Sequence, residues 1–434
     1  MKKVITYGTY DLLHRGHIRL LQRAKALGDY LIVGVTADDF DKKRGKINVQ
    51  QSLMERIEGV RATGLADEII VEEYEGQKID DVRKYDVDVF TVGSDWAGKF
   101  DYLKDYCDVV YLDRTEGVSS SEIRAKKAGV RLGLAGNSSV LLKYARESGF
   151  VNGITLAGIC TRRQELTAQL EIPRLPYDEL LDVCDGVYVN APPQEHTAYI
   201  RTALQRGKHV IYEAPLAMDR TTAQELLDLA RERGCILMEA VKTAYATAYA
   251  RLLLLAKTWA IGDIYSVDSV CTSLNTDNDS DQSSLYAWGP TALLPVFQLL
   301  GTEYAGCRMA VHTDEDGKDL FCRLSLEYPH AVATAKVGIG VKSEGELVIS
   351  GTKGCIYVPA PWWKTDYFEI RCENSNDNKK YFYQLDGEGI RYELVAFVKA
   401  IENGRLLSNI TREETVKLCQ VMEDFCKKEN LWQL

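Results

Sequence analysis

Two histidines, three residues apart, are the first side chains in the sequence with an evident chemical use. His14 and His17 follow an apolar run that ends at Gly8, and Gly16 stands between them. Strand, glycine turn and helix start in this order place backbone N–H groups and a positive helix end where a phosphate chain can lie. Imidazoles there can donate hydrogen bonds to oxygens that gain charge in phosphoryl or nucleotidyl transfer. A lone histidine is more often a cap or a half-buried residue, but the pair predicts catalysis.

A second candidate site lies in the segment VRLGLAGNSS at 130–139, which is typical of a strand and a tight turn before a helix. A dinucleotide pyrophosphate docks at such a turn. Gly133 and Gly136 are present, but Ser138 and Leu141 stand at the later positions of a full glycine motif. A purely structural turn is therefore the alternative interpretation.

The end of the next strand indicates which dinucleotide would bind. It reads ICTRR and carries no Asp or Glu to accept a ribose 2′-hydroxyl, whereas Arg162 or Arg163 could pair with a 2′-phosphate. The sequence therefore predicts NADP(H) if a nicotinamide cofactor binds.

The elements that must position these residues belong to a globular α/β chain. With 434 residues we expect two to four domains, and 46% hydrophobic with 27% charged residues excludes disorder. The net charge of −10 disfavours nucleic acid and anionic membrane surfaces. Scattered cysteines without a CxxC pair predict reduced thiols, and the absence of a long apolar run or a signal peptide predicts a soluble cytoplasmic protein.

Hydrophobic patterning predicts three domains. Apolar runs alternate with amphipathic segments in 1–128 and again in 129–245, which is typical of parallel sheets with helices on their faces. Residues 246–434 show alternating runs that favour an antiparallel sheet, followed by helices at 391–402 and 411–428. The predicted fold class is α/β: a nucleotidyltransferase domain, a dinucleotide-binding Rossmann domain, and an α+β domain with an open antiparallel sheet.

Motifs in the first domain carry a family resemblance. GTYDLLHRGH at 8–17, RGK at 44–46, GSDWAGKFDYLK at 93–104 and RTEGVSSSEIR at 114–124 occur in order. Together they resemble the glycerol-3-phosphate cytidylyltransferase family over residues 1 to about 127. An adenylyltransferase is a competing assignment, because HxGH occurs there too, but the last two motifs argue against it.

The resemblance implies a set of roles at the first site. A CTP site would include Gly8, Thr9, Tyr10, Asp11, Asp95, Trp96, Arg114, Thr115, Ser119 and Ser120, with His14, His17 and Lys46 as catalytic groups and Asp11 near Mg²⁺. The acceptor phosphate would contact Arg44, Arg56 and Lys78, although a surface cation is usually only solvated. Family members often have arginine at the position of Gly64 and lysine at that of Arg44, so the acceptor geometry is expected to differ.

The remaining motifs resemble the Gfo/Idh/MocA oxidoreductases over about 130–434. They are NAPPQEH at 190–196, GKHVIYEAPLAM at 207–218, CILMEAVKTAY at 235–245 and GTKGCIYV at 351–358. The implied cofactor site comprises Gly133, Gly136, Asn137, Ser138, Arg162, Arg163, Pro192, Glu213 and Pro215. The family's usual lysine is replaced by Ala214, and its downstream histidine is missing near Thr291.

A carbonyl reduction still needs a proton donor. Lys242 is the first candidate and Tyr245 the second, while Lys242 paired with a carboxylate is the alternative. His196 follows a Pro-Pro turn, where facing the nicotinamide and capping a helix are both open.

These observations predict a homo-oligomeric bifunctional enzyme for teichoic acid or capsule synthesis. One activity would form a CDP-polyol from CTP and a glycerol-, ribitol-, arabinitol- or mannitol-phosphate. The other would make that polyol phosphate by NADPH-dependent reduction of a ketose or aldose phosphate. The alternative is a cytidylyltransferase whose C-terminal region is a catalytically dead oligomerisation or regulatory module.

Overall fold

The computed structural model of the chain describes residues 1–37, 51, 53–73, 76–113, 129–151, 153–274, 283–383, 385–406 and 409–434. The fold separates into two compact units, Met1–Gly129 and Val130–Leu434. The border predicted at 245 lies inside the second unit.

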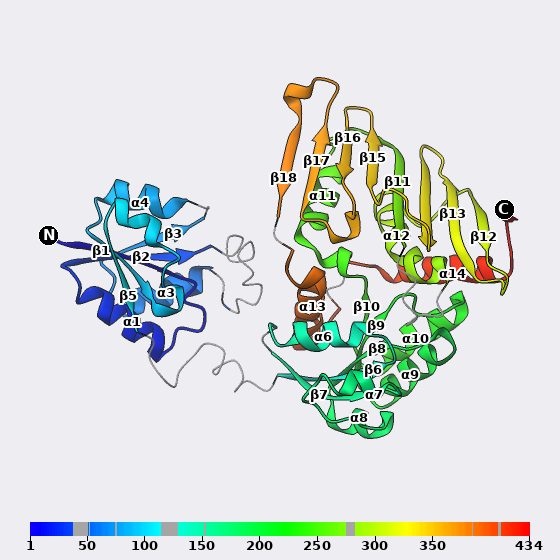
Figure 1. Ribbon diagram of the computed structural model, residues 1–434, viewed down its shortest axis with the longest axis horizontal. Coiled ribbons are helices and arrows are strands. Elements are labelled where there is room, and N and C mark those ends of the chain that lie inside the picture. The colour runs from blue at the N-terminus through cyan, green and yellow to red at the C-terminus, as the bar shows by residue number, and fades with distance from the viewer. Residues whose placement is uncertain are drawn as a thin grey trace. The chain divides into compact units, whose positions relative to one another are not determined.

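The first unit is built on a parallel sheet with the strand order β3-β2-β1-β4-β5 (Figure 1). Its strands are β1 (Lys3–Gly8), β2 (Tyr30–Thr36), β3 (Glu68–Glu72), β4 (Val89–Gly93) and β5 (Asp108–Leu112). Its helices are α1 (Arg15–Lys25), α3 (Leu53–Ala62) and α4 (Gln77–Tyr85), with short 3-10 helices η1 (Ser94–Trp96) and η2 (Asp101–Asp105). The central strand β1 pairs with β2 on one side and β4 on the other, so the direction of winding reverses beside it. A crevice for a ligand is expected at the carboxyl end of such a switch point.

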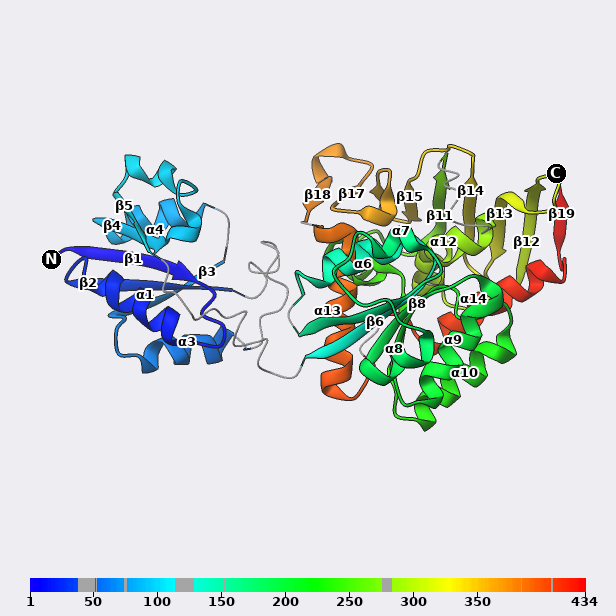
Figure 2. The same cartoon turned by 60° about the horizontal axis from the view of Figure 1, so that its bottom comes forward.

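Alternating side chains of the strands serve two hydrophobic cores. Val4 and Val33 face Leu21 of α1 and Val60 of α3, whereas the opposite face packs against α4 and η2. Figure 2 shows α1 and α3 on one side of the sheet and α4 on the other. Because both faces are covered, the strands are nearly continuous apolar runs.

The second unit begins with another parallel sheet, of order β10-β9-β8-β6-β7. Its strands are β6 (Val130–Gly136), β7 (Ile154–Cys160), β8 (Gly186–Asn190), β9 (His209–Glu213) and β10 (Leu237–Ala240). The helices are α6 (Val140–Ser148), α7 (Gln164–Thr167), α8 (Tyr177–Val183), α9 (Pro193–Gln205) and α10 (Arg220–Glu232). The first strand β6 lies between β7 and β8, which is again a switch point at its carboxyl end.

The third sheet contains nine described strands in the order β18-β17-β16-β15-β11-β14-β13-β12-β19. They are β11 (Ile264–Ser273), β12 (Gly306–Thr313), β13 (Asp319–Glu327), β14 (Val332–Ile339), β15 (Leu347–Gly351), β16 (Cys355–Val358), β17 (Tyr367–Arg371), β18 (Lys379–Phe382) and β19 (Leu431–Gln433). The sheet is mixed, because β11 pairs with β14 and β12 with β19 in parallel. The expected antiparallel sheet is thus only partly found, since alternating polarity reports which face is buried but not the direction of the neighbouring strand.

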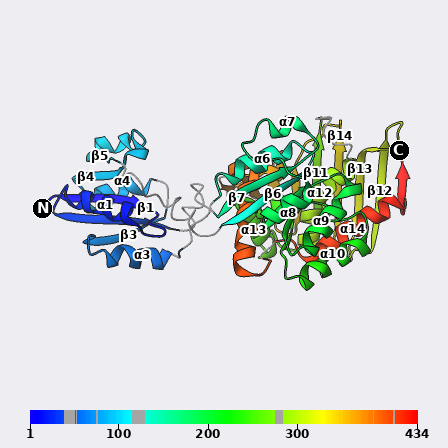
Figure 3. The ribbon, with the colours of Figure 1, turned by 90° about the horizontal axis from the view of Figure 1, so that it is seen from below.

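Helices join this sheet to the parallel sheet of the second unit. They are α11 (Thr247–Lys257), α12 (Ser284–Leu300), α13 (Ile390–Asn403) and α14 (Arg412–Cys426), with 3-10 helices η3 (Lys242–Tyr245), η4 (Trp362–Lys364), η5 (Ser375–Asp377) and η6 (Asp386–Gly389). Buried Cys419 of α14 belongs to the core of the parallel sheet of the second unit, and Figure 3 shows α14 beside α10. A capping box of Thr411 and Glu414 starts α14.

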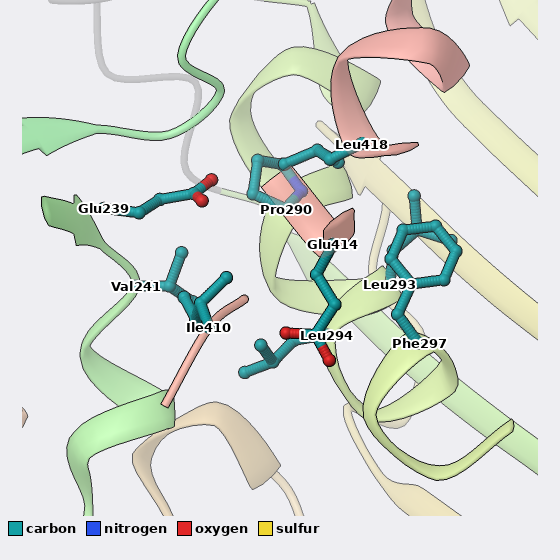
Figure 4. Close-up of a pocket in the computed structure, with 9 residues that line it drawn as sticks. All are labelled: Glu239, Val241, Pro290, Leu293, Leu294, Phe297, Ile410, Glu414 and Leu418. Carbon is teal, nitrogen blue, oxygen red and sulfur yellow. The ribbon is translucent and has the colours of Figure 1, made fainter. Parts of the chain in front are cut away.

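A small cavity lies where β10, α12 and α14 meet (Figure 4). Its volume is about 20 Å³, which is room for a single water molecule. Glu239 of β10 points into it beside Pro290 of α12, and the hydroxyl of Thr415 donates a hydrogen bond of 2.6 Å to that carboxylate. This cavity is part of the packing between the two sheets and cannot hold a substrate.

Among the described residues, no helix is both long and apolar enough to cross a membrane.

Candidate active sites

The turn after β1 brings the two predicted catalytic histidines together. Tyr10 and Leu12 have positive φ angles of 53° and 48°, which bend the chain sharply between the strand and α1. The ring of Tyr10 folds back over Gly8, where a Cβ atom would lie only 3.0 Å from it. A larger residue at Gly8 would therefore displace the tyrosine and the turn that it supports.

His14 is the N-cap of α1 and stacks on His17. Its Nδ1 accepts a hydrogen bond of 3.0 Å from the N–H of Gly16, so the neutral ring carries its proton on Nε2. The two ring centroids lie 4.0 Å apart, and Tyr10 packs edge-on against His17 at 5.5 Å. The structure therefore places two imidazoles, both partly exposed, at the positive end of one helix.

Hydrogen bonds of Asp11 and Arg56 hold the backbone of this turn in place. Asp11 is 4% exposed, and its carboxylate accepts a hydrogen bond of 3.0 Å from the N–H of Gln51. Arg56 is fully buried and donates to the carbonyl oxygens of Thr9 at 2.7 Å and Thr36 at 2.8 Å. In this arrangement the guanidinium positions the Thr9 turn, and its predicted contact with the acceptor phosphate stays a prediction.

Lys78 occupies a buried network on the other face of the sheet. Its ammonium group forms an ion pair with Glu72 and lies 4.6 Å from the ring centroid of Tyr7. Tyr7 in turn donates a hydrogen bond of 2.8 Å to Asp81. The predicted role of Lys78 toward the acceptor phosphate also stays a prediction, because this lysine already has an anionic partner inside the domain.

Several predicted residues of the first site lie outside the described part of the chain. They are Arg44, Lys46, Arg114, Thr115, Ser119 and Ser120, together with the side chain of Asp95. Trp96 is described in η1, where it packs against Phe100 and lies under the ammonium group of Lys99 at 5.0 Å.

The dinucleotide turn of the second unit requires glycine at one position. Gly136 ends β6 with a φ of 141°, and a Cβ atom there would lie 1.8 Å from the carbonyl oxygen of Asn190. Gly133 is also close-packed, because a Cβ would meet Leu180 at 3.0 Å. The backbones of β6 and β8 therefore approach each other closely at this turn, as a dinucleotide site requires, even though Ser138 stands where a later glycine is usual.

A cavity of about 400 Å³ opens next to this turn. Gly136 and Asn137 line it on one side, and Arg162, Arg174 and Glu195 contribute charged groups. Arg162 donates a hydrogen bond of 2.8 Å to Glu195, and its backbone N–H bonds to the Asn137 side chain at 2.9 Å. A cavity of this size beside a glycine turn fits the adenosine half of a dinucleotide, and two arginines fit a 2′-phosphate.

The other predicted cofactor residues lie outside the lining of this cavity. Arg163 donates to the carbonyl oxygen of Asn137 at 3.3 Å and pairs with Glu165 at 2.7 Å. Ser138 accepts from the N–H of Val140, and Pro192 is the N-cap of α9. Pro215 follows β9 through a cis peptide bond with Ala214.

A buried tyrosine–glutamate cluster lies at the ends of β8 and β9. Tyr188 donates a hydrogen bond to Glu213, Tyr144 donates to Glu393, and the two tyrosine rings stack at 3.6 Å. Burial raises the pKa of Glu213 against the opposing effects of Tyr188 and Lys242. Burial and the charge of Glu213 raise the pKa of Glu393 to about 8.

The candidate proton donors differ in their surroundings. Lys242 is partly exposed, and its ammonium group lies 3.2 Å from the carboxylate of Glu388. Tyr245 is buried and donates to the backbone carbonyl of Glu239 at 3.0 Å. Burial lowers the pKa of His196 to about 4, and its ring packs edge-on against Tyr212, which favours a structural role. Only Lys242 combines an acidic proton with access from solvent among these three.

Comparison with known proteins assigns the first unit. Residues 5–126 match the cytidylyltransferase-like family model. A glycerol-3-phosphate cytidylyltransferase of Bacillus spizizenii is 49% identical over 130 residues, which is 30% of this chain and 100% of the relative. The chain belongs to the cytidylyltransferase family. The cytidylyltransferase domain therefore carries the paired histidines of the first site.

The second unit contains an oxidoreductase domain of the Gfo/Idh/MocA type. Residues 133–241 match the family model for the NAD-binding Rossmann fold of these oxidoreductases. A dTDP-3,4-didehydro-2,6-dideoxy-alpha-D-glucose 3-reductase of Streptomyces violaceoruber is 32% identical over 177 residues, covering 38% of this chain and 52% of that protein.

Solved structures extend the likeness to the fold of the whole second unit. A 3-ketoreductase from Actinomadura kijaniata, in complex with NADP and TDP-benzene, superposes with a TM-score of 0.63 at 19% identity. The match covers 70% of this chain and 99% of that structure. This similarity shows that the second unit shares its overall fold with that structure.

Sequence patterns missed several residues of the second site. Arg174 lies between two prolines, in a segment that pairs with β7 at Ile159, and no spacing rule connects it with Arg162. Tyr188 lies on a buried strand, where a tyrosine is easily taken for core. Glu393 lies within α13, about 180 residues from Glu213 along the chain. Only the folded chain brings these groups together.

Proposed function

We propose that the chain makes a CDP-polyol in two steps, for use in a cell-surface polymer such as a teichoic acid or a capsule. The second unit reduces a ketose or aldose phosphate with NADPH, and the cytidylyltransferase domain joins the resulting polyol phosphate to CTP. The observation that carries this proposal is the presence of both domains in one chain, because their fusion is useful when one makes what the other consumes.

In the transfer step, a phosphate oxygen of the polyol phosphate attacks the α-phosphorus of CTP in line, and pyrophosphate leaves. The attacking oxygen is already anionic at neutral pH, so no base is required. His14 and His17 donate hydrogen bonds to phosphate oxygens that gain charge, and the start of α1 adds its positive dipole. Asp11 would hold a Mg²⁺ ion, which would supply positive charge to the triphosphate.

The turn around Thr9 supports this step by holding the histidines in place. Arg56 ties the Thr9 carbonyl to Thr36, and Gly8 lets the Tyr10 ring pack under the turn. Positioning of this kind supplies much of the rate in nucleotidyl transfer, since little covalent chemistry is asked of the protein.

In the reduction step, NADPH, when bound, would supply the hydride that reduces the carbonyl carbon of the sugar phosphate. Arg162 and Arg174 would hold the 2′-phosphate of the cofactor, and the Gly136 turn would hold its pyrophosphate. Lys242 gives a proton to the carbonyl oxygen as the hydride arrives, in place of the lysine that Ala214 replaces. The buried pair of Tyr188 and Glu213 lies near enough for the ammonium group of Lys242 to act electrostatically on the Glu213 carboxyl group.

The coupled reaction tests the proposal directly. The full chain is incubated with CTP, NADPH and a panel of ketose and aldose phosphates, and NADPH absorbance and pyrophosphate are followed together. We expect one sugar phosphate to consume NADPH and to release pyrophosphate in equal amounts. Pyrophosphate release with a supplied polyol phosphate, but no NADPH oxidation with any member of the panel, would leave the alternative of a catalytically dead second unit.

We also propose that the chain forms a homo-oligomer through its third sheet. Tyr265 of β11 and Val332 of β14 are 59% and 54% exposed on strands that pair with each other. Exposed apolar side chains on neighbouring strands favour association. Light scattering in dilute buffer should give a mass well above the 48.7 kDa of one chain.

A further inference from the structure

Three lysines from three separate elements converge on one carboxylate in the second unit. The Nζ atoms of Lys143, Lys242 and Lys364 lie 3.2, 3.2 and 3.0 Å from Glu388. The four side chains are 29% to 50% exposed, so a solute can reach them. Among the described residues, Glu388 is the one carboxylate within ion-pair distance of these three ammonium groups, so positively charged groups outnumber negatively charged ones at this contact.

Glu388 holds its place in an unfavourable backbone conformation. Its φ angle is 55°, and its neighbours Gly387 and Gly389 have φ angles of 56° and 96°. A non-glycine residue is strained in this region, and the surrounding contacts must offset that strain. Partial burial raises the pKa of Glu388, but the neighbouring ammonium groups of Lys364 and Lys242 lower it to about 2. The carboxylate of Glu388 therefore occupies the place that an anionic ligand could take on these lysines. If this carboxylate leaves the lysines, the strained segment around Glu388 can relax.

The cluster lies beside the groups assigned to reduction. Lys143 is in the first turns of α6, the helix that follows the dinucleotide turn, and Gly389 packs against Lys242. Lys242 also acts electrostatically on buried Glu213 at the end of β9. An anion on these lysines would therefore lie close to both the cofactor turn and the proposed proton donor.

We propose that this cluster is the phosphate subsite of the reductase, and that Glu388 occupies it until a sugar phosphate displaces it. The inference rests on the proposed reduction of a sugar phosphate. Lys143 and Lys364 together match the two negative charges of a phosphomonoester, and its oxygens accept hydrogen bonds from both ammonium groups. Departure of Glu388 frees Lys242 to donate its proton to the carbonyl oxygen of the same substrate.

This arrangement links recognition to catalysis. With Glu388 in place, Lys242 is engaged by a carboxylate and is poorly placed to protonate a substrate. A sugar that lacks the phosphate cannot displace Glu388 and leaves Lys242 engaged. The enzyme would thus select phosphorylated substrates twice, once through binding and once through release of its proton donor.

The cofactor is the other source of phosphate that these lysines could meet. The cavity with Arg162 and Arg174 opens between β7 and α9, whereas the lysine cluster is formed by α6, η3, η4 and η6. The described geometry therefore favours the substrate. Binding of NADP⁺ to the lysine variants separates the two sources.

Inorganic phosphate is a suitable first probe, titrated calorimetrically into the full chain saturated with NADP⁺. Glu388→Gln should bind phosphate about tenfold more tightly than the wild type, because the internal competitor loses its charge. Lys143→Met and Lys364→Met should each bind about tenfold more weakly. Lys353→Met, which removes an exposed lysine elsewhere in the same unit, is the matched control and should change nothing. Every variant keeps the same cytidylyltransferase domain, so any phosphate that binds there is common to all titrations. Differences in phosphate affinity between the variants therefore report on the lysine cluster.

The outcomes are separable. Unchanged or weaker phosphate binding by folded Glu388→Gln would overturn the subsite, and this gain-of-binding variant remains informative even if a lysine variant fails to fold. If Lys364→Met binds NADP⁺ more weakly but binds phosphate as the wild type does, the lysines contact the cofactor. That result would also overturn the proposed phosphate subsite.

Kinetics provide the second arm, with a ketopentose and its 5-phosphate as substrates for NADPH oxidation. Glu388→Gln should narrow the preference in kcat/KM for the phosphorylated sugar about tenfold, because Lys242 is then free with either substrate. An unchanged preference would overturn the proposal. If no sugar phosphate is reduced but the phosphate-binding pattern holds, the reduction fails while the anion subsite stands.

Discussion

The two candidate sites of this chain differ in how their chemical groups are gathered. In the cytidylyltransferase domain, a ten-residue stretch from Gly8 to His17 supplies the turn, the helix end and both imidazoles. In the second unit, the groups come from strands, short helices and α13, separated by up to about 250 residues. A site built from one stretch keeps its geometry wherever that stretch folds, whereas a dispersed site depends on the packing of the whole unit.

The sites also differ in their electrostatics. His14 and His17 lie near the surface at a helix N-terminus, where the field favours an anionic ligand. The second site places Glu213 and Glu393 in the interior, where burial raises their pKa values. Loss of one group should therefore be a local event at the first site and should disturb several coupled groups at the second.

The largest expected effect tests the local site. His17→Ala should lower the rate of pyrophosphate release from CTP by about 10² to 10³, the usual cost of one lost transition-state donor. NADPH binding by the second unit should not change. His312→Ala, at an exposed histidine of β12, is the matched control. A folded His17→Ala enzyme with turnover near that of the wild type would remove the catalytic assignment.

The next effect tests the dispersed site. Lys242→Met should lower NADPH oxidation about 100-fold, since the alkoxide then lacks a positioned acid. Cytidylyl transfer to a supplied polyol phosphate should stay unchanged, because the two reactions use different domains. Stopped-flow measurement of NADPH absorbance gives the rate of the hydride step, and wild-type rates in the variant would assign proton donation to another group.

A smaller effect concerns the choice of cofactor. Arg162→Ala and Arg174→Ala should each weaken NADPH binding about 10- to 100-fold and leave NADH binding nearly unchanged, because only NADPH carries the 2′-phosphate. Arg308→Ala removes a strongly exposed arginine of β12 and serves as the control. Equal losses for both cofactors in calorimetric titrations would contradict a 2′-phosphate contact.

The smallest effect is a pH dependence of stability from a group outside either site. Burial raises the pKa of Glu239 to about 7. The folded chain therefore holds more protons than the unfolded chain between about pH 4.5 and 7, and the free energy of unfolding falls as the pH rises through that range. Glu239→Gln removes this dependence.

The expected readout is a melting temperature that depends on pH less steeply in Glu239→Gln than in the wild type. The gap between the two should grow from pH 5 to pH 7 and should correspond to a free energy on the order of 2 kcal/mol. Glu303→Gln, at a carboxylate that is 93% exposed, should follow the wild-type curve. Parallel curves for Glu239→Gln and the wild type would show that Glu239 does not titrate in this range.

The sequence by itself determined the α/β class, the order of the sheets and the local site. Buried parallel strands need continuous apolar runs, and a helix start needs a cap. Both features can therefore be recognised from a few consecutive residues. The helices predicted at 391–402 and 411–428 correspond to α13, Ile390–Asn403, and α14, Arg412–Cys426. The spacing of Gly8, His14 and His17 predicts their proximity for the same reason, because one short stretch forms the turn and the start of the helix. Their catalytic role stays a prediction.

Only the tertiary structure decided strand direction in the third sheet and the membership of the dispersed site. Side-chain alternation is the same in parallel and antiparallel strands, so the β11–β14 pair could not be foreseen. Arg174, Tyr188 and Glu393 have no periodic relation to their partners. Lys143, Lys364 and Glu388 likewise meet because three separate segments pack together, and a charged residue in a surface loop carries no local signal of the charges that folding brings to it.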